Sequence, residues 1–286
     1  MEKRISLLNS GSRYLSQAGI ENSLQEAEIF LSHTLSCPRF ELYLDNLEVQ
    51  KTKQEHFWQL LNARMQGLPV QYLLGSTEFM GLEFSIRPGV FVPRPETEIL
   101  LEEVLKLSAF SLQPSAKVLD IGTGCGNIAI SLAKFRGNYS IFACDISETA
   151  LKLAKVNSFE HKTAVSFVKS DLFSAFKKRE LFSLIISNPP YIKTNTIYSL
   201  SREVQHEPKC ALDGGADGLF YYRKIIKDAT DYLKKGGLLA LEIGDGQSVA
   251  VREILDQSGD FCNISIVKDY NNLDRVVVAH RKALNG

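Results

Sequence analysis

Apolar residues recur at helical spacing through the first 75 residues of the chain. Two runs carry the pattern, Leu24, Ala27, Leu31 and Leu35, then Phe57, Leu60, Leu61 and Met65. The stretch Ser23–Glu26, SLQE, matches a capping box, in which the first and last side chains bond each other's backbone N–H groups. Because the region lacks strand-like alternation, we predict a small helical bundle over residues 1–75.

A different pattern follows this region. The stretch FMGLEFSIRPGVFV has strand-favouring residues on both sides of Pro88 and Gly89. It predicts a hairpin linker over residues 76–94 that turns at these two residues.

Short apolar runs and helical segments alternate from residue 95 to residue 286. The runs are KVLDIG, SIFACD, VSFVKSD, FSLIISN and GLLALEIG. Ser147–Asn157 and Asp217–Lys235 have helical periodicity, and Gly236 is the expected C-cap of the second. The last run, ISIVKDYNNLDRVVVAH, contains two strands joined by a polar turn. This order predicts an α/β domain with a mainly parallel sheet covered by helices and a terminal antiparallel pair.

Composition narrows the function classes. Lys plus Arg and Asp plus Glu number 33 each, so the formal net charge is zero, and we expect no direct nucleic-acid partner held by bulk charge. The segment MEKRISLLNS has no long apolar run, and no stretch approaches 18 apolar residues, so we expect a cytoplasmic protein without a membrane partner. The five cysteines form no C-x-x-C pair and the five histidines are scattered, so we predict no metal site.

In a parallel sheet, ligands bind outside the carboxyl ends of the strands, so residues that follow each apolar run are candidates. The first run leads into Asp120 and the loop Gly122, Thr123, Gly124, Cys125 and Gly126. The spacing G-x-G-x-G departs from the G-x-G-x-x-G of dinucleotide sites, and no Lys-Ser/Thr follows as a P-loop requires. A phosphate-binding role is therefore disfavoured.

Carboxylates follow the next two runs. Asp145 lies 25 residues after Asp120 and is placed to accept hydrogen bonds from ribose hydroxyls, while Asp171 and Leu172 offer a carboxylate and an apolar surface to adenine. Together with Asn188 after the fourth run, they describe a pocket for a ligand with ribose and adenine but no phosphate. S-adenosylmethionine matches that description.

The fourth run ends in Asn188, Pro189, Pro190 and Tyr191, the tetrapeptide NPPY. Proline cannot donate to a sheet ladder and fixes its own φ, so the strand must stop in a stiff loop. Asn188 precedes a proline and is excluded from the helical region, which holds one amide at a strand end. By itself, the tetrapeptide fits a strand-ending turn equally well.

Several separated motifs resemble one family in the same order. VLDIGTGCGNIAISLA, ACDIS and NPPY are similar to class I, Rossmann-like, S-adenosylmethionine-dependent amino-methyltransferases. PVQYLLGSTEFMGLEF, FVPRPETE, SNPPYI, EPKCALDGGADGLFYYR and LEIGDGQ resemble, more narrowly, the HemK/PrmC family of protein-(glutamine-N5) methyltransferases, which modify peptide chain release factors in translation termination. The resemblance runs from about residue 18 nearly to the C-terminus.

The resemblance implies roles for the candidate residues. Gly122–Gly126 and Asp145 would bind the cofactor, with Leu172 near its adenine and Asn188 beside its methionine portion. Asn188, Pro189, Pro190 and Tyr191 would receive the glutamine of the release factor's Gly-Gly-Gln loop, with Asn188, Pro189 and Tyr191 as the catalytic set. Residues 1–75 would recognise the factor, and residues 95–286 would form the catalytic domain. Met80 and Leu172 stand where relatives often carry aromatic residues.

Two other functions stay open on the residues. An NPPY loop also suits methylation of adenine N6 or cytosine N4, which would require base flipping and is disfavoured by the neutral charge. A cofactor-binding interaction module without catalysis would not need the Asn188 acceptor. Arg94, Glu96 and Thr97 are further candidates for the pocket entrance, and we expect a structural role for Glu242.

Overall fold

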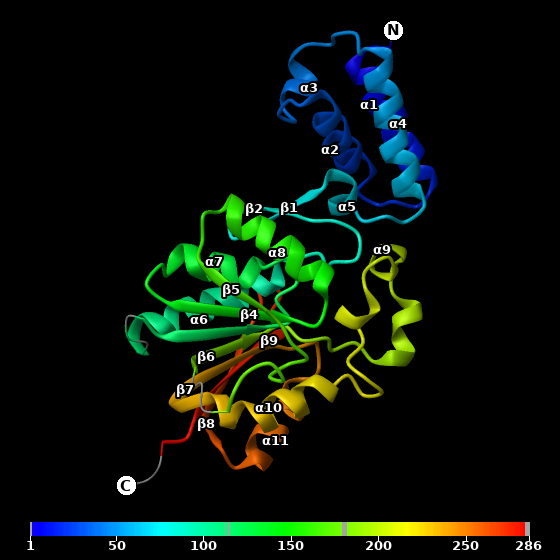
Figure 1. Cartoon of the computed structure of the whole chain (residues 1–286). Coiled ribbons are helices and arrows are strands. Elements are labelled where there is room, and N and C mark those ends of the chain that lie inside the picture. Colours follow the sequence, from blue (N-terminus) through cyan, green and yellow to red (C-terminus); the bar gives the residue numbers. More distant parts are fainter. Residues whose placement is uncertain (1, 112, 114, 179–181, 284–286) are drawn as a thin grey trace. The chain divides into compact units, whose positions relative to one another are not determined.

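The computed structural model describes all residues except 1, 112, 114, 179–181 and 284–286. The chain forms two compact units. The helical unit comprises residues 1–76 and 201–206, and the α/β unit comprises residues 77–200 and 207–286 (Figure 1). The helical unit thus takes in residues 201–206, which are distant from the rest of it in sequence.

The helical unit contains α1 Arg4–Gln17, α2 Ser23–Leu35, α3 Glu41–Leu44, α4 Lys51–Met65, α5 Val70–Leu74 and the separate α9 Arg202–Gln205. Its buried core contains Leu7, Leu8, Leu15, Ala27, Phe30, Leu31, Leu42, Val49, Phe57, Leu60 and Leu61. The two predicted apolar runs lie on α2 and α4, so the predicted helical region is confirmed.

The predicted capping box is wrong. Asn22 is the N-cap of α2 and makes no side-chain cap hydrogen bond. Glu26 instead accepts hydrogen bonds from the buried guanidinium of Arg64, Nε to Oε2 at 2.7 Å and Nη2 to Oε1 at 3.1 Å. Arg64 also pairs with Glu203 of α9. Satisfying this buried cation outweighs a local cap, because an unpaired buried charge costs far more free energy than a lost cap.

The α/β unit is built on a seven-stranded sheet in the order β5-β4-β3-β6-β7-β9-β8. The strands are β3 Lys117–Ile121, β4 Ser140–Asp145, β5 Val165–Lys169, β6 Phe182–Ser187, β7 Leu233–Glu242, β8 Phe261–Lys268 and β9 Asp274–Arg281. The pairs among β3 to β7 are parallel, and β9 runs antiparallel to both β7 and β8. The predicted sheet and its terminal antiparallel pair are confirmed.

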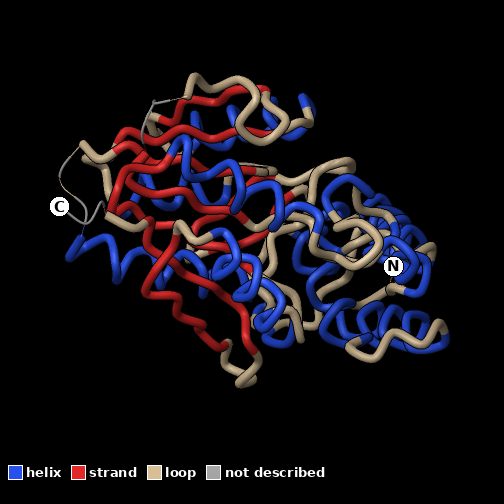
Figure 2. The backbone as a smooth tube through the Cα atoms, turned by 90° about the horizontal axis from the view of Figure 1, so that it is seen from below, coloured by secondary structure: helices blue, strands red, loops and turns tan. Residues whose placement is uncertain are grey.

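Helices cover both faces of this sheet, as Figure 2 shows. They are α6 Glu96–Ser111, α7 Asn127–Phe135, α8 Glu148–Glu160, α10 Phe220–Tyr232 and α11 Ser248–Ser258, with 3₁₀ turns at Thr194–Ser199 and Lys209–Ala211. Alternate residues of each strand face opposite ways, so Leu238 packs into the core under α6 and α7, and Leu239 into the core under α10 and α11. Burial on both faces explains the nearly continuous apolar runs in the sequence.

One predicted turn and one predicted helix end lie elsewhere. The hairpin consists of β1 Ser76–Phe79 and β2 Leu82–Ser85, so its turn is at Met80 and Gly81 and not at Pro88 and Gly89. Met80 and Gly81 both have positive φ, 54° and 70°, as a two-residue hairpin turn requires. The helix predicted to reach Lys235 ends at Tyr232, because Leu233 turns extended, pairs with Phe182 and is fully buried.

Within the described residues, no helix combines the length and the apolar character needed to cross a membrane.

Candidate active site

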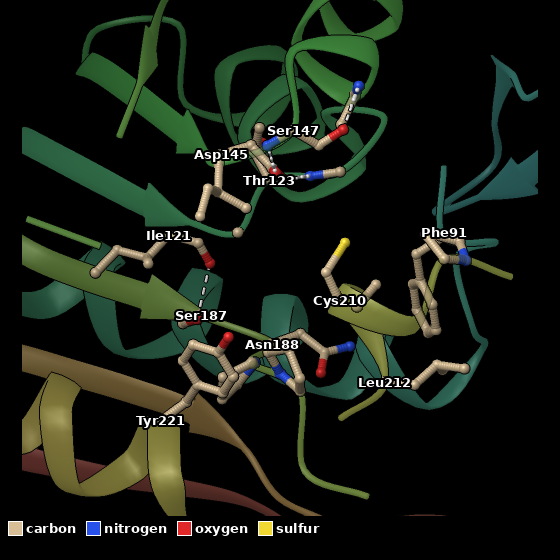
Figure 3. Close-up of a pocket in the computed structure, with 18 of the residues that line it drawn as sticks. Phe91, Ile121, Thr123, Asp145, Ser147, Ser187, Asn188, Cys210, Leu212 and Tyr221 are labelled. Carbon is tan, nitrogen blue, oxygen red and sulfur yellow. Dashed lines mark hydrogen bonds between the residues drawn. The ribbon is translucent and has the colours of Figure 1, made fainter. Parts of the chain in front are cut away.

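A cavity opens at the carboxyl ends of β3, β4, β5 and β6 in the α/β unit (Figure 3). Because these parallel strands are neighbours, the residues that follow them meet at one edge of the sheet. The lining includes Phe91, Thr97, Gly122, Thr123, Gly124, Asp145, Ile146, Ser147, Ser170, Asp171, Leu172, Asn188, Pro189, Pro190, Tyr191, Cys210, Leu212 and Tyr221. The structure therefore brings together residues from four separate strand ends.

Of the three candidates for the pocket entrance, Thr97 lines this cavity, whereas Arg94 and Glu96 do not. All but two of the residues predicted to bind the cofactor or the substrate line it. The exceptions are Cys125, whose buried thiol lies 3.8 Å from Asn127 Oδ1, and Gly126, which is the N-cap of α7 at φ 89°. A Cβ on Gly126 would lie 2.7 Å from Ile130 and 3.2 Å from Ala154. Both residues therefore pack behind the loop, where they shape it.

Asp145 anchors the glycine loop. Its Oδ2 accepts a hydrogen bond from the Gly124 N–H at 2.9 Å, and its Oδ1 accepts one from the Ser147 N–H at 2.8 Å. Burial raises the pKa of Asp145, and these backbone hydrogen bonds oppose the rise. Each carboxylate oxygen keeps a further lone pair with which to accept a ligand hydroxyl.

The lining suits a ligand without phosphate. A Cβ on Gly124 would meet no heavy atom within 4 Å, and one on Gly122 would meet only the Asn188 carbonyl at 4.0 Å, so the two glycines leave open space at the loop. Among the described lining residues there is no Lys, Arg or His, and the charged groups are the carboxylates of Asp145 and Asp171. Carboxylates accept hydrogen bonds from hydroxyl and amino groups and attract a positively charged sulfur. The lining offers no cation that would bind a phosphate group.

Asp120 lies below the loop and is fully buried. Its Oδ2 accepts a hydrogen bond from the Thr123 hydroxyl at 2.6 Å, while its Oδ1 has no hydrogen-bond partner among the described residues. Burial raises the pKa of Asp120 to about 7, and the negative charge of Asp145 adds to the rise. Asp120 therefore shapes the loop through Thr123.

The NPPY loop is held from behind by a second segment. The Ile192 N–H donates to the Leu212 carbonyl at 2.9 Å, and the Gly214 N–H donates to the Ile192 carbonyl at 2.8 Å. Gln247 Nε2 donates to the Tyr191 carbonyl at 3.0 Å. A Cβ on Gly214 would lie 2.7 Å from Tyr191 Cα, so only glycine allows this approach. No local sequence pattern of this glycine-rich segment predicts that it supports the NPPY loop.

The Asn188 amide is oriented by Thr97, in the first turn of α6. Asn188 Nδ2 donates to Thr97 Oγ1 at 3.0 Å, so the amide nitrogen faces Thr97 and Oδ1 is the other end of the group. Behind them, the Tyr191 hydroxyl donates to Glu242 Oε1 at 3.4 Å. Burial raises the pKa of Glu242 to about 7, against hydrogen bonds from Thr97 and Tyr191 that lower it.

Several lining residues are not predicted from the sequence. Phe91 reaches the cavity from the segment before α6, and the Arg94 guanidinium lies 5.1 Å from the centre of its ring. Arg94 in turn pairs with the buried Glu207. Cys210, Leu212 and Tyr221 enter from the segment after the NPPY loop (Figure 3). They come from loops or helix starts, where no apolar periodicity marks them.

Comparisons with known proteins cover nearly the whole chain. Residues 6–75 match the model of the PrmC N-terminal domain, and residues 81–218 match that of the methyltransferase small domain. A release factor glutamine methyltransferase of Thermodesulfovibrio yellowstonii is 38% identical over 261 residues, covering 91% of this chain and 93% of that protein. The release factor glutamine methyltransferase of Moorella thermoacetica is 38% identical over 281 residues, covering 96% of this chain and 97% of that protein.

A solved structure matches the fold. The crystal structure of a methyltransferase from Pyrococcus furiosus aligns with a TM-score of 0.54 at 22% identity, covering 72% of this chain and 91% of that one. This likeness supports the Rossmann-like architecture of the α/β unit.

Asp120→Asn is expected to change how stability depends on pH. Because the folded pKa of Asp120 is about 7, against an ordinary value of 3.8, its protonation stabilises the folded state fully below pH 3.8. That contribution is lost as the pH rises through about 7. The Tm of the variant minus that of the wild type should therefore increase by roughly a few degrees between pH 5 and pH 8. Glu242 titrates in both proteins, so the difference isolates Asp120. A difference that stays constant with pH would contradict this account.

Proposed function

Because this chain belongs to the PrmC/HemK family of release factor glutamine methyltransferases, we propose that it methylates the side-chain nitrogen of the glutamine in the Gly-Gly-Gln loop of a peptide chain release factor. S-adenosylmethionine is the methyl donor. The observation that carries the proposal within the structure is the Asn188 amide, held at the edge of a cavity that suits this donor. A release factor works in translation, so we propose that the protein acts in the cytoplasm.

The cavity residues divide into two groups. Gly122, Thr123 and Gly124 form the loop against which the donor lies, and Asp145 accepts hydrogen bonds from its ribose hydroxyls. Asp171 and Leu172 flank the adenine, and Cys125 and Gly126 act indirectly by fixing the shape of the loop. When bound, S-adenosylmethionine supplies a methyl group on a positively charged sulfur. The carboxylates of the cavity match the positive charge of that group.

The second group, the NPPY residues, binds and orients the side-chain amide of the glutamine. An amide nitrogen is a poor nucleophile because its lone pair is shared with the carbonyl group. Asn188 Oδ1 and the Pro189 carbonyl each accept one N–H of the glutamine amide, so that the face of its nitrogen is directed at the methyl group. Tyr191 packs against the planar amide, and Pro190 keeps the loop stiff. Positioning of this kind contributes up to about 7–11 kcal/mol in favourable intramolecular models.

The same two acceptors favour the transition state over the ground state. Positive charge develops on the nitrogen as the new N–C bond forms, and it strengthens both N–H···O hydrogen bonds. One proton must then leave the nitrogen, to solvent or to a neighbouring group. The prolines hold the acceptors in place before the substrate arrives, so little reorganisation is needed.

The helical unit is the proposed recognition domain for the release factor. It carries exposed apolar side chains on and beside α3, among them Phe40, Tyr43 and Leu44. Its match to the PrmC N-terminal domain supports a role shared within the family.

Methyl transfer to a release factor tests the function directly. The protein is incubated with S-adenosylmethionine labelled in the methyl group and with one of three acceptors: a release factor, the same factor with its Gly-Gly-Gln glutamine replaced by alanine, or duplex DNA. Label is expected in the first acceptor alone. Label in DNA and none in the factor would instead support amino-methylation of a base.

Asn188→Ala is expected to lower the rate of methyl transfer to the release factor by at least about 100-fold, because one of the two acceptors for the glutamine amide is lost. Donor affinity should fall much less than the rate does, since the glycine loop and Asp145 are untouched and Asn188 lies only beside the methionine portion of the donor. Single-turnover rates and calorimetric titration with the donor measure the two effects. Transfer at the wild-type rate would contradict the proposed role of Asn188.

Asp145→Ala is expected to weaken donor binding by roughly 10- to 100-fold, because it removes a charged hydrogen-bond acceptor and the anchor of Gly124. Calorimetric titration with S-adenosylmethionine measures the change. Glu148→Ala is the control, since Glu148 is a surface carboxyl of the next helix that does not line the cavity. Equal affinities of the two variants would argue against a contact between Asp145 and the donor.

A further inference from the structure

Two buried polar side chains lie behind Asn188, and the proposed reaction does not yet use them. Thr97 is 2% exposed in the first turn of α6, and Glu242 is 1% exposed at the carboxyl end of β7. Burying a carboxyl group costs free energy unless its oxygens are hydrogen-bonded. Glu242 Oε2 nevertheless has no hydrogen-bond partner among the described residues. A carboxyl group kept at such a cost calls for a functional explanation.

The hydrogen bonds form a chain with a fixed direction. Asn188 Nδ2 donates to Thr97 Oγ1 at 3.0 Å, and hydrogen bonding from the Thr97 hydroxyl is among the causes that lower the pKa of Glu242. A hydroxyl group has one hydrogen, so Thr97 can donate to Glu242 only while it accepts from Asn188. The nitrogen of the Asn188 amide must then face Thr97, which leaves the oxygen as the end that can meet a substrate.

We propose that Glu242 and Thr97 are positioning residues that hold the Asn188 amide with its oxygen available to the glutamine N–H. The inference rests on the proposed function and adds to it the groups that orient its acceptor. Neither residue touches the substrate in this account. Both act through Asn188.

The charge of Glu242 sets the direction of the chain. An ionised carboxylate only accepts hydrogen bonds, whereas a protonated carboxyl group can also donate to Thr97. Thr97 could then donate to Asn188 Oδ1, which would turn the amide over and present its N–H groups to the N–H groups of the substrate. Two donors facing each other cannot hydrogen-bond, so that orientation is unproductive.

Several groups around Glu242 influence its protonation. Arg275 of β9 favours the ionised form, and Glu96 of α6 opposes it. The Tyr191 hydroxyl donates to Oε1, and the Tyr222 hydroxyl of α10 donates to the main-chain carbonyl of Glu242. Burial is the largest influence and raises the pKa of Glu242 to about 7. The productive orientation should therefore become more populated as the pH rises through about 7.

Two substitutions of Thr97 separate orientation from packing. Thr97→Val keeps the branched shape of the side chain but removes the hydroxyl group, and Thr97→Ser keeps the hydroxyl group. We expect Thr97→Val to lower the single-turnover rate of methyl transfer by roughly 10- to 100-fold, with donor affinity within about threefold of wild type. Thr97→Ser should stay within about threefold of the wild-type rate. Equal rates for the two variants would overturn the proposal.

The pH profile of Glu242→Gln supplies a second readout that a purely structural role would not change. The wild-type rate at saturating donor and release factor should rise between pH 6 and pH 8, whereas the Glu242→Gln rate should be lower at pH 8 and lose this rise. Asp120 titrates in both proteins, so the difference between the profiles belongs to Glu242. A variant profile parallel to that of the wild type would count against the proposal.

These outcomes distinguish the inference from the proposed function. A wild-type protein that does not methylate the release factor contradicts the function itself. A wild-type protein that does so, with Thr97→Val equally active, contradicts only the positioning role. If Glu242→Gln does not fold, the comparison of the two Thr97 variants still decides.

Discussion

An amide can serve as a hydrogen-bond acceptor only if its oxygen faces the partner, and this constraint governs the role that we propose for Asn188. Asn188 meets the constraint because its nitrogen is bound to Thr97 at 3.0 Å. The prolines that follow restrict its backbone, and the segment containing Gly214 packs against the loop from behind. The parallel sheet brings this loop to the same edge as the glycine loop and Asp145. Orientation of one amide thus depends on contacts from α6, β6, β7 and the segment before α10.

Much of the architecture could be predicted from the sequence. Strands buried on both faces leave nearly unbroken apolar runs, so β3, β4, β6 and β7 can be predicted from the sequence, as can the helices α2, α4 and α8. Because residues that follow the ends of neighbouring parallel strands converge, the sequence predicts Asp145, Asp171 and Asn188 in one pocket, and all three line the cavity. The family resemblance rests on these strand ends together with separated motifs elsewhere in the chain, and relatives along nearly the whole chain support it.

Other features depend on tertiary contacts that leave no local pattern. The capping box failed because Glu26 pairs with Arg64, 38 residues away in sequence. The predicted end of α10 is wrong because Leu233 pairs with Phe182 in the sheet. This pairing outweighs the helix-ending signal of Gly236, three residues later. In the sequence, only one weak feature indicates a role for Glu242, namely that it is a lone carboxylate at the end of an apolar run. Its relation to Thr97 and Asn188 joins three elements that are far apart in the chain, so only the structure could show it.

A crystal structure of the protein with S-adenosylhomocysteine and a release factor that retains its Gly-Gly-Gln glutamine would test the central claim most directly. The account predicts that the glutamine side-chain nitrogen lies about 2.7–3.2 Å from Asn188 Oδ1, with Asn188 Nδ2 still bonded to Thr97. A glutamine amide bound elsewhere in the cavity, or an Asn188 oxygen turned toward Thr97 in that complex, would contradict it.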